Sequence, residues 1–231
     1  MPKGLVISDL HLFSPRSLGD EILPQLRAKL SATQLLVING DLVDFRWSVL
    51  GDVPSTAQSA LMWLGHLLED FKNLRLHYVI GNADYRKWYL EGLKEFAKSQ
   101  PRLAVHEEYL ILDRKLFLHG DIVHARGDLN SYRARCEAAG HGSRLFDKLY
   151  DFAVASGLSR WHAARQSQSH SAQAIVEYLS QKNDPRLASI REIYFGHTHA
   201  PFENFRHDNL LFHNTGALMR GLSGNMVLFE I

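Results

Sequence analysis

The chain has 231 residues, 45% of them hydrophobic and 22% charged, which suits one large soluble domain or a domain with an insertion. Its formal net charge of +1 gives no general attraction for nucleic acid, and no apolar run approaches the roughly 20 residues of a membrane-spanning helix. Cys136 is the only cysteine, which excludes an intramolecular disulfide and favours a reducing compartment. Because no secretory signal precedes the first strand-like run, we expect a cytoplasmic protein, with contact to the inner membrane face left open.

The first half of the chain alternates short apolar runs with helix-period segments. The apolar runs are branched and continuous, which predicts buried strands, and a helix is expected after each of them. The strands are expected at residues 5–8, 35–38 and 76–80, and the helices at 20–30, 56–71 and 87–98. Two further runs, 109–112 and 115–118, flank Asp113-Arg114 and indicate a hairpin.

The second half contains a helical block between strands. Residues 123–181 show only helix-period segments interrupted by glycines, and strand patterns return at 192–195, 202–206, 210–212 and 226–230. This order predicts an α/β fold in which a two-sheet β-sandwich is flanked by helices. We expect a single domain over residues 1–231, with residues 123–181 forming a helical cap insertion that overhangs the strand ends.

Polar side chains of the metal-binding kind follow five of the strand-like runs. They are Asp9, His11, Asp41, Asn82, His119, His197 and His199. In α/β sheets ligands bind beyond the carboxyl ends of strands, so these side chains should converge. Carboxylate and imidazole ligands suit Mn, Fe, Co, Ni or Zn, and a central carboxylate can bridge two ions about 3.5–4 Å apart. Asp41 is the candidate bridge.

The same residues lie in five ordered motifs. They are Asp9-Leu10-His11, Gly40-Asp41-Leu42-Val43-Asp44, Gly81-Asn82-Ala83-Asp84, His119-Gly120-Asp121 and Gly196-His197-Thr198-His199. This series resembles the calcineurin-like metallophosphoesterases. The resemblance implies two divalent ions, with manganese expected first and Fe, Zn, Co or Ni as alternatives. One ion would be held by Asp9, His11, Asp41 and His199, and the other by Asp41, Asn82, His119 and His197. Asp41, Asn82 and His119 would also be the catalytic residues.

The third motif departs from the family pattern at Ala83, where the broad family carries histidine. In that family the histidine is associated with the leaving group or the scissile phosphate, so we assign position 83 to the substrate site. A methyl group there removes a proton donor but leaves all seven expected metal ligands. The sequence does not distinguish a natural alanine from a substituted one.

The helical block resembles that of the UDP-2,3-diacylglucosamine hydrolases of lipid A synthesis, which carry arginine in the third motif. Ala83 lacks that arginine too. The resemblance places Tyr132, Arg165, Ser167 and Ser169 at the substrate. Arg133 and Arg135 are either phosphate clamps or solvated helix charges. Further candidates for substrate contact are His124, His141, His162 and His170. A set of apolar residues forms either a cap core or an acyl groove: Leu145, Phe146, Leu149, Phe152 and Trp161.

We therefore expect a di-metal phosphoesterase that uses a metal-activated hydroxide to cleave a pyrophosphate bond in a nucleotide-linked lipid such as UDP-2,3-diacylglucosamine. The expected partner is a phosphorylated small molecule or glycolipid and not a nucleic acid, and contact of the cap with a membrane surface is left open. One alternative is a phosphodiesterase or phosphatase acting on a soluble nucleotide or sugar phosphate. The other is a non-catalytic scaffold of the same fold, disfavoured because buried carboxylates and imidazoles without ions are costly.

Overall fold

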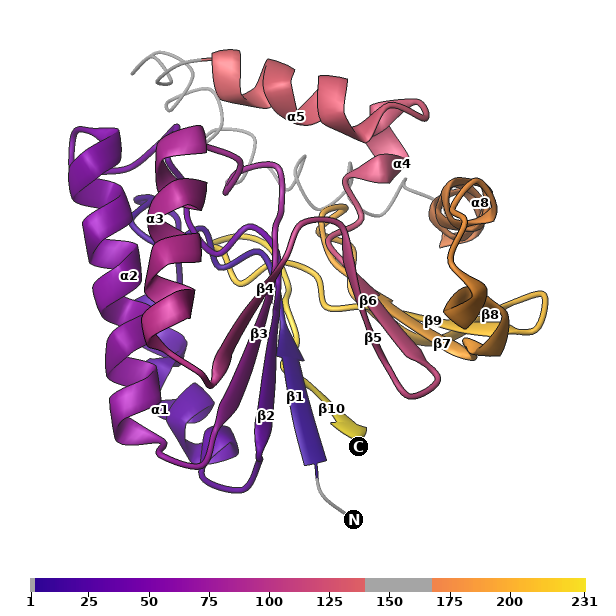
Figure 1. Ribbon diagram of the computed structural model, residues 1–231, viewed down its shortest axis with the longest axis horizontal. Helices are drawn as coiled ribbons and strands as arrows, with labels where there is room; N and C mark the ends of the chain where they lie inside the picture. The colour runs from indigo at the N-terminus through magenta and orange to yellow at the C-terminus, as the bar shows by residue number, and fades with distance from the viewer. Residues whose placement is uncertain (1–2, 140–167) are drawn as a thin grey trace.

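The computed structural model describes residues 3–139 and 168–231, and the first of its two sheets lies against three helices (Figure 1). The strands of this sheet are β1 (Lys3–Ile7), β2 (Leu35–Asn39), β3 (Arg75–Val79), β4 (Leu103–His106) and β10 (Val227–Glu230). The helices on its outer face are α1 (Gly19–Leu30), α2 (Val53–Asp70) and α3 (Lys87–Ser99). The strand order is β10-β1-β2-β3-β4, with β1 to β4 parallel and β10 antiparallel to β1. Burial on both faces explains the continuous apolar runs of β1 and β2.

The second sheet packs face to face with the first. Its strands are β5 (Tyr109–Leu112), β6 (Lys115–Leu118), β7 (Glu192–Phe195), β8 (Phe202–His207) and β9 (Leu210–Asn214), in the order β5-β6-β7-β9-β8. β5 and β6 form the expected hairpin, and β6, β7 and β9 run parallel. The stacked rings of Phe117 and Tyr194, with centroids 4.9 Å apart, belong to the apolar layer between the sheets. The predicted two-sheet sandwich flanked by helices is confirmed.

The edge strand β4 was not predicted from the sequence. It pairs in parallel with β3, yet only Leu103 of its four residues is fully buried. A short edge strand with one buried side chain has too little apolar content to show a strand period.

The described parts of the expected cap are helical. They form α4 (Ile122–Ala125), α5 (Leu129–Ala138) and α8 (Gln168–Ser180), and a short 3₁₀ helix, Pro185–Ser189, leads into β7. Figure 1 shows α5 lying across the carboxyl ends of the strands, as a cap would. Four candidates for substrate contact, His141, His162, Arg165 and Ser167, and the apolar set from Leu145 to Trp161 lie outside the described residues. Across residues 3–139 and 168–231, no helix has both the length and the apolar content to cross a bilayer.

Candidate metal centre

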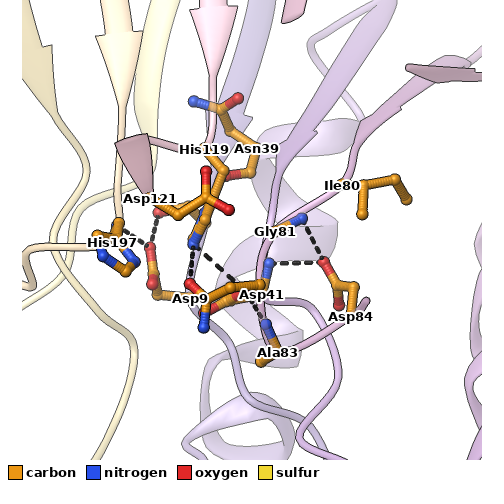
Figure 2. A network of polar contacts seen from close by, with 12 residues as sticks. Asp9, Asn39, Asp41, Ile80, Gly81, Ala83, Asp84, His119, Asp121 and His197 are labelled. Atoms are coloured by element: carbon orange, nitrogen blue, oxygen red, sulfur yellow. Dashed lines mark hydrogen bonds and ion pairs between the residues drawn. The ribbon is translucent and has the colours of Figure 1, made fainter. Parts of the chain in front are cut away.

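The predicted ligands meet at the carboxyl ends of the parallel strands. Two groups can each offer atoms within 4.8 Å of one another: Asp9, His11 and His199 in one, and Asp41, His119 and His197 in the other. β1 and β2 lead to the aspartates, while β6 and β7 lead to His119 and His197. The convergence expected from strand topology is therefore seen in the structure (Figure 2).

The first group, around Asp9, has at its centre one carboxylate oxygen that accepts no hydrogen bond from the described residues. Asp9 is fully buried, and its Oδ1 has no hydrogen-bond partner among the described residues. His199 Nε2 lies 3.2 Å from that oxygen, and His11 Nε2 lies 3.9 Å from it. A buried carboxylate oxygen without a donor is costly, and a divalent cation would satisfy it. The donor set thus fits a metal ion.

The second group is joined to the first through Asp41. Asp41 Oδ2 lies 3.7 Å from His11 Nε2, while Oδ1 lies 3.3 Å from His119 Nε2. Asn82 Oδ1 is 3.3 Å from the same His119 nitrogen, so Asn82 also faces this group. The two oxygens of Asp41 face different groups, which is the placement that a bridging carboxylate requires.

The backbone at the ligands is strained. Positive φ angles between 46° and 63° occur at Asp9, His11, Asp41, His197 and His199. Non-glycine residues rarely adopt this region, and each costs of order 1 kcal/mol or more, so such residues cluster at functional sites. The strained turns are tied together, since Asp9 N–H donates to Gly40 O and His11 N–H donates to Asp41 O, both at 3.0 Å.

Two motif glycines are required by close approach to the ligands. At Gly40, where φ is 87°, an added Cβ would come 2.3 Å from His119 Nδ1. At Gly196 it would come 2.2 Å from Asp9 Oδ2. A side chain at either position would displace a ligand, so these glycines shape the centre directly.

Asp84, the last residue of the third motif, orients the loops and was not assigned a role from the sequence. Its buried carboxylate accepts hydrogen bonds from the backbone N–H groups of Asp41 at 2.7 Å and Gly81 at 3.0 Å (Figure 2). It also accepts from the backbone N–H of Val43 at 3.0 Å. Burial, together with the charge of Asp41, raises the pKa of Asp84 to about 6. The only sign of this role in the sequence was the position of Asp84 at the end of the third motif. The motif alone does not show which residues Asp84 contacts.

The protonation of the ligands follows from their mutual charges. Burial lowers the pKa of His119, but the charge and hydrogen bond of Asp41 outweigh it and raise that pKa to about 10. Burial likewise lowers the pKa of His11, which Asp44, Asp41 and Asp9 raise to about 9. Burial, then the neighbouring His119, hold the pKa of His197 well below its usual value. The carboxylates thus draw positive charge into the centre, and divalent ions would supply it.

A pocket of about 330 Å³ opens beside the centre. Its wall combines metal-facing residues with cations and aromatic rings: His11, Asp44, Arg46, Trp47, Asn82, Ala83, Arg86, Tyr132, Arg135, Cys136 and Ala139. Ala83 and Tyr132 therefore lie where substrate contact was expected. Arg46, Trp47 and Arg86 were missed; each follows a motif aspartate by two or three residues, and that proximity was the available signal.

Arg133 does not take the place expected for a phosphate clamp. It is 2% exposed, and its Nε donates to Asp121 Oδ2 at 2.6 Å. Its other nitrogens donate to the carbonyls of Glu107 at 2.6 Å and Ile80 at 2.7 Å. These partners occupy the donors on all three nitrogens of the guanidinium, so the prediction that Arg133 binds phosphate is wrong. Ser169 is exposed on α8 and is not among the residues lining the pocket.

Comparison with known proteins places this centre in a family. The sequence matches the calcineurin-like phosphoesterases over residues 3–201. It is similar to the crystal structure of the nuclease MPE of Pseudomonas putida, at 22% identity over 50% of this chain and 53% of that one, with a TM-score of 0.34, so the match spans about half of the nuclease. It is also similar to a dimetal phosphatase of Danio rerio, at 12% identity over 95% of this chain and 88% of that one, with a TM-score of 0.45. A comparison with curated proteins gave no match. Because the family match covers most of its length and includes all five motifs, the chain belongs to the calcineurin-like phosphoesterases.

Proposed function

We propose that this enzyme hydrolyses a phosphoanhydride bond in a nucleotide-linked lipid of the UDP-2,3-diacylglucosamine kind. The observation that carries the proposal is the shared wall of the pocket. Three arginines, Arg46, Arg86 and Arg135, line the same cavity as the metal-facing residues His11 and Asn82.

The three arginines suit a second phosphate beside the one at the metal centre. Guanidinium groups bind phosphate oxygens in a bidentate manner and keep their charge when buried. Arg86 is only 8% exposed, and its Nη1 donates to Cys136 O at 3.0 Å, so its side chain is already ordered. A simple phosphomonoester or alkyl diester has no second phosphate for this wall, whereas a diphosphate does.

Ala83 favours the same class of substrate. An alkoxide leaving group is strongly basic and needs a positioned acid, whereas a phosphate monoester, with a second pKa of about 6, leaves without protonation at neutral pH. The methyl group of Ala83 lines the pocket, and the backbone N–H of Ala83 donates to Asp41 Oδ1 at 2.8 Å. The alanine therefore holds the candidate bridge but donates no side-chain proton.

Within this proposal the chain orients the substrate and neutralises its charge. Bound divalent ions would supply an activated water and polarise a phosphoryl oxygen. Arg46, Arg86 and Arg135 would hold the departing phosphate and offset the charge that develops on it.

The lipid part of the proposal is supported by exposed apolar side chains that are close in sequence to residues lining the pocket. Val49 and Leu50 are 66% and 38% exposed, and they follow Trp47 by two and three residues. Trp88, at 52% exposed, follows Arg86 by two residues. Exposed apolar residues beside a polar site are suited to acyl chains presented at a membrane surface.

The test compares three substrates with added Mn²⁺: UDP-2,3-diacylglucosamine, UDP-glucose and bis(p-nitrophenyl) phosphate, the last of which has one phosphate only. We expect kcat/KM to fall in that order. Arg86→Met should lower kcat/KM for both diphosphates by about 10- to 100-fold, the value of a charged hydrogen bond, and change the chromogenic diester less than threefold. Lys87→Met, which removes an exposed cation next in the chain, is the matched control.

Two outcomes separate the alternatives. Faster hydrolysis of the chromogenic diester than of both diphosphates, or an equal loss on all substrates in Arg86→Met, would overturn the anhydride proposal. Equal rates on UDP-glucose and the diacylated substrate would assign the enzyme to soluble nucleotide sugars and remove the lipid from the proposal.

A further inference from the structure

Two of the metal-facing histidines are oriented by a second contact of the ring. His119 Nε2 faces Asp41, and its Nδ1 lies 3.1 Å from the carbonyl oxygen of Asn39. A carbonyl only accepts, so Nδ1 donates to it, and Nε2 is the nitrogen that would bind an ion once its own proton has left. His11 Nε2 faces the aspartates in the same way, and its Nδ1 lies 3.3 Å from Asp44 Oδ2. Such second contacts are general for metal-ligating histidines.

The second ring contact of His197 is with another imidazole, whereas those of His119 and His11 are with oxygen atoms. Its Nε2 lies 2.6 Å from Nδ1 of His124, and the ring centroids are 4.8 Å apart. His197 is also fixed through its backbone N–H, which donates to Asp9 Oδ2 at 3.0 Å. Because His124 occupies Nε2, the nitrogen that His197 can offer to an ion beside Asp41 is Nδ1.

The direction of this hydrogen bond decides whether His197 can be a ligand. If His124 donated, His197 would carry its proton on Nδ1 and turn an N–H toward the ion site. If His197 donates from Nε2, its Nδ1 keeps a lone pair. Only the second arrangement completes the group of Asp41, His119 and His197.

The short helix α4 places His124 firmly. It begins directly after the fourth motif, and His124 N–H donates to Asp121 O at 3.1 Å. The neighbouring side chains Ile122, Val123 and Ala125 are buried in the core that includes α8. Position 124 is therefore anchored on both sides while its ring contacts His197.

We propose that His124 is a positioning residue for the second ion, because its Nδ1 accepts the Nε2 proton of His197 and so keeps His197 Nδ1 available as a ligand. This role requires an acceptor at the Nδ1 position and nothing else from the side chain. It does not depend on which phosphorylated substrate the enzyme cleaves, so its failure and that of the proposed substrate are separable.

The test is Mn²⁺ binding to the metal-free full-length protein, measured by calorimetry together with the spin-coupling signature of a Mn²⁺ pair. His124→Ala should weaken one of two sites by about 10- to 100-fold, the range for loss of such a partner, and leave the other unchanged. His124→Asn should stay within about threefold of the parent, because the amide oxygen occupies the place of Nδ1. His124→Gln places its oxygen one bond further out and should resemble His124→Ala. His66→Ala, which removes an exposed imidazole on α2, controls for adventitious binding.

Activity gives a second measurement. The turnover lost in His124→Ala should return at saturating Mn²⁺, because the defect lies in occupancy, and the thermal midpoint of the metal-free variant should match the parent. Unchanged affinity in His124→Ala, or equal losses in the Ala and Asn variants, would overturn the proposal. Turnover that stays low at saturating Mn²⁺ would assign His124 to the substrate and overturn it as well.

Discussion

The buried pair of Arg133 and Asp121 predicts a large and specific loss of stability on mutation. Both residues are 2% exposed, and Arg133 ties α5 to the loops that follow β3, β4 and β6 through Ile80, Glu107 and Asp121. Arg133→Ala leaves a buried carboxylate without its partner, which costs about 3–5 kcal/mol. At 2–4 °C per kcal/mol for a chain of this size, the thermal midpoint should fall by roughly 6–20 °C.

The assay is thermal and urea unfolding of the metal-free protein, with Arg135→Ala as the matched control. Arg135 lies on the same helix and carries the same charge, but it is exposed and lines the pocket. Its loss should change the free energy of unfolding by less than about 1 kcal/mol. Replacing both members of the pair, as in Asp121→Leu with Arg133→Met, should recover about half of the loss, since an apolar pair of similar volume carries no unpaired charge.

The same variants test what Arg133 does in the enzyme. At a temperature where Arg133→Ala is folded, any loss of turnover should fall equally on a diphosphate and on a small chromogenic ester. A loss below about 1 kcal/mol in Arg133→Ala would refute the stability argument. A selective loss on the diphosphate would return Arg133 to the phosphate-binding role that the sequence suggested.

The remaining predictions concern the centre and one histidine pair. Asp41→Ala should abolish turnover and the second ion, measured by metal analysis; two tightly bound ions in this variant would contradict a bridging role. Ala83→His should raise turnover on an alkyl phosphate ester by roughly 10²–10⁴-fold and leave a diphosphate nearly unchanged, and an equal gain on both would show that position 83 stabilises the phosphoryl group. Cys136→Ser should keep its turnover, because the reaction needs no thiol nucleophile; lost turnover with metals still bound would count against that mechanism. Burial, with the nearby His106, lowers the pKa of His77 to about 4, so the unfolded chain binds the proton first and stability should fall as pH drops from about 6.5 to 4. Allowing for solvent access, His77→Gln should remove about 1 kcal/mol of that fall between pH 7 and 5 in urea unfolding, and an unchanged slope would show that His77 titrates normally.

The positions of the candidate ligands could be predicted because they depend on topology. Polar residues after parallel strands must meet at one edge of a sheet, so Asp9 and Asp41 are brought together by the pairing of β1 with β2. The sequence could not separate Arg133 from Arg135 in the same way. Both lie on a helix of weak amphipathic character, and only the position of Asp121 on a different element decides which of them is buried.

The contacts that orient the metal-facing residues also could not be predicted from the sequence. Asp84 acts on Asp41 through a backbone N–H, and His124 acts on His197 through a single ring nitrogen. Neither contact leaves a periodic pattern, because each joins residues more than 40 positions apart through one atom pair. Motifs therefore indicate which residues face the ions, whereas three-dimensional structure is needed to show what holds them.

The centre forms on the seam between the two sheets, and this links the chemistry to the packing of the sandwich. Asp9, Asp41 and Asn82 follow strands of the first sheet, whereas His119, His197 and His199 follow strands of the second. Asn39, at the end of β2, joins the two sheets at this point: its Nδ2 donates to Tyr194 O at 2.9 Å, and its carbonyl accepts from His119 Nδ1 at 3.1 Å. A relative shift of the sheets would thus move His119 away from Asp41. The apolar layer between the sheets supplies the stability that holds five ligands in strained backbone conformations and a carboxylate oxygen in a buried site, a cost that recurs at functional centres.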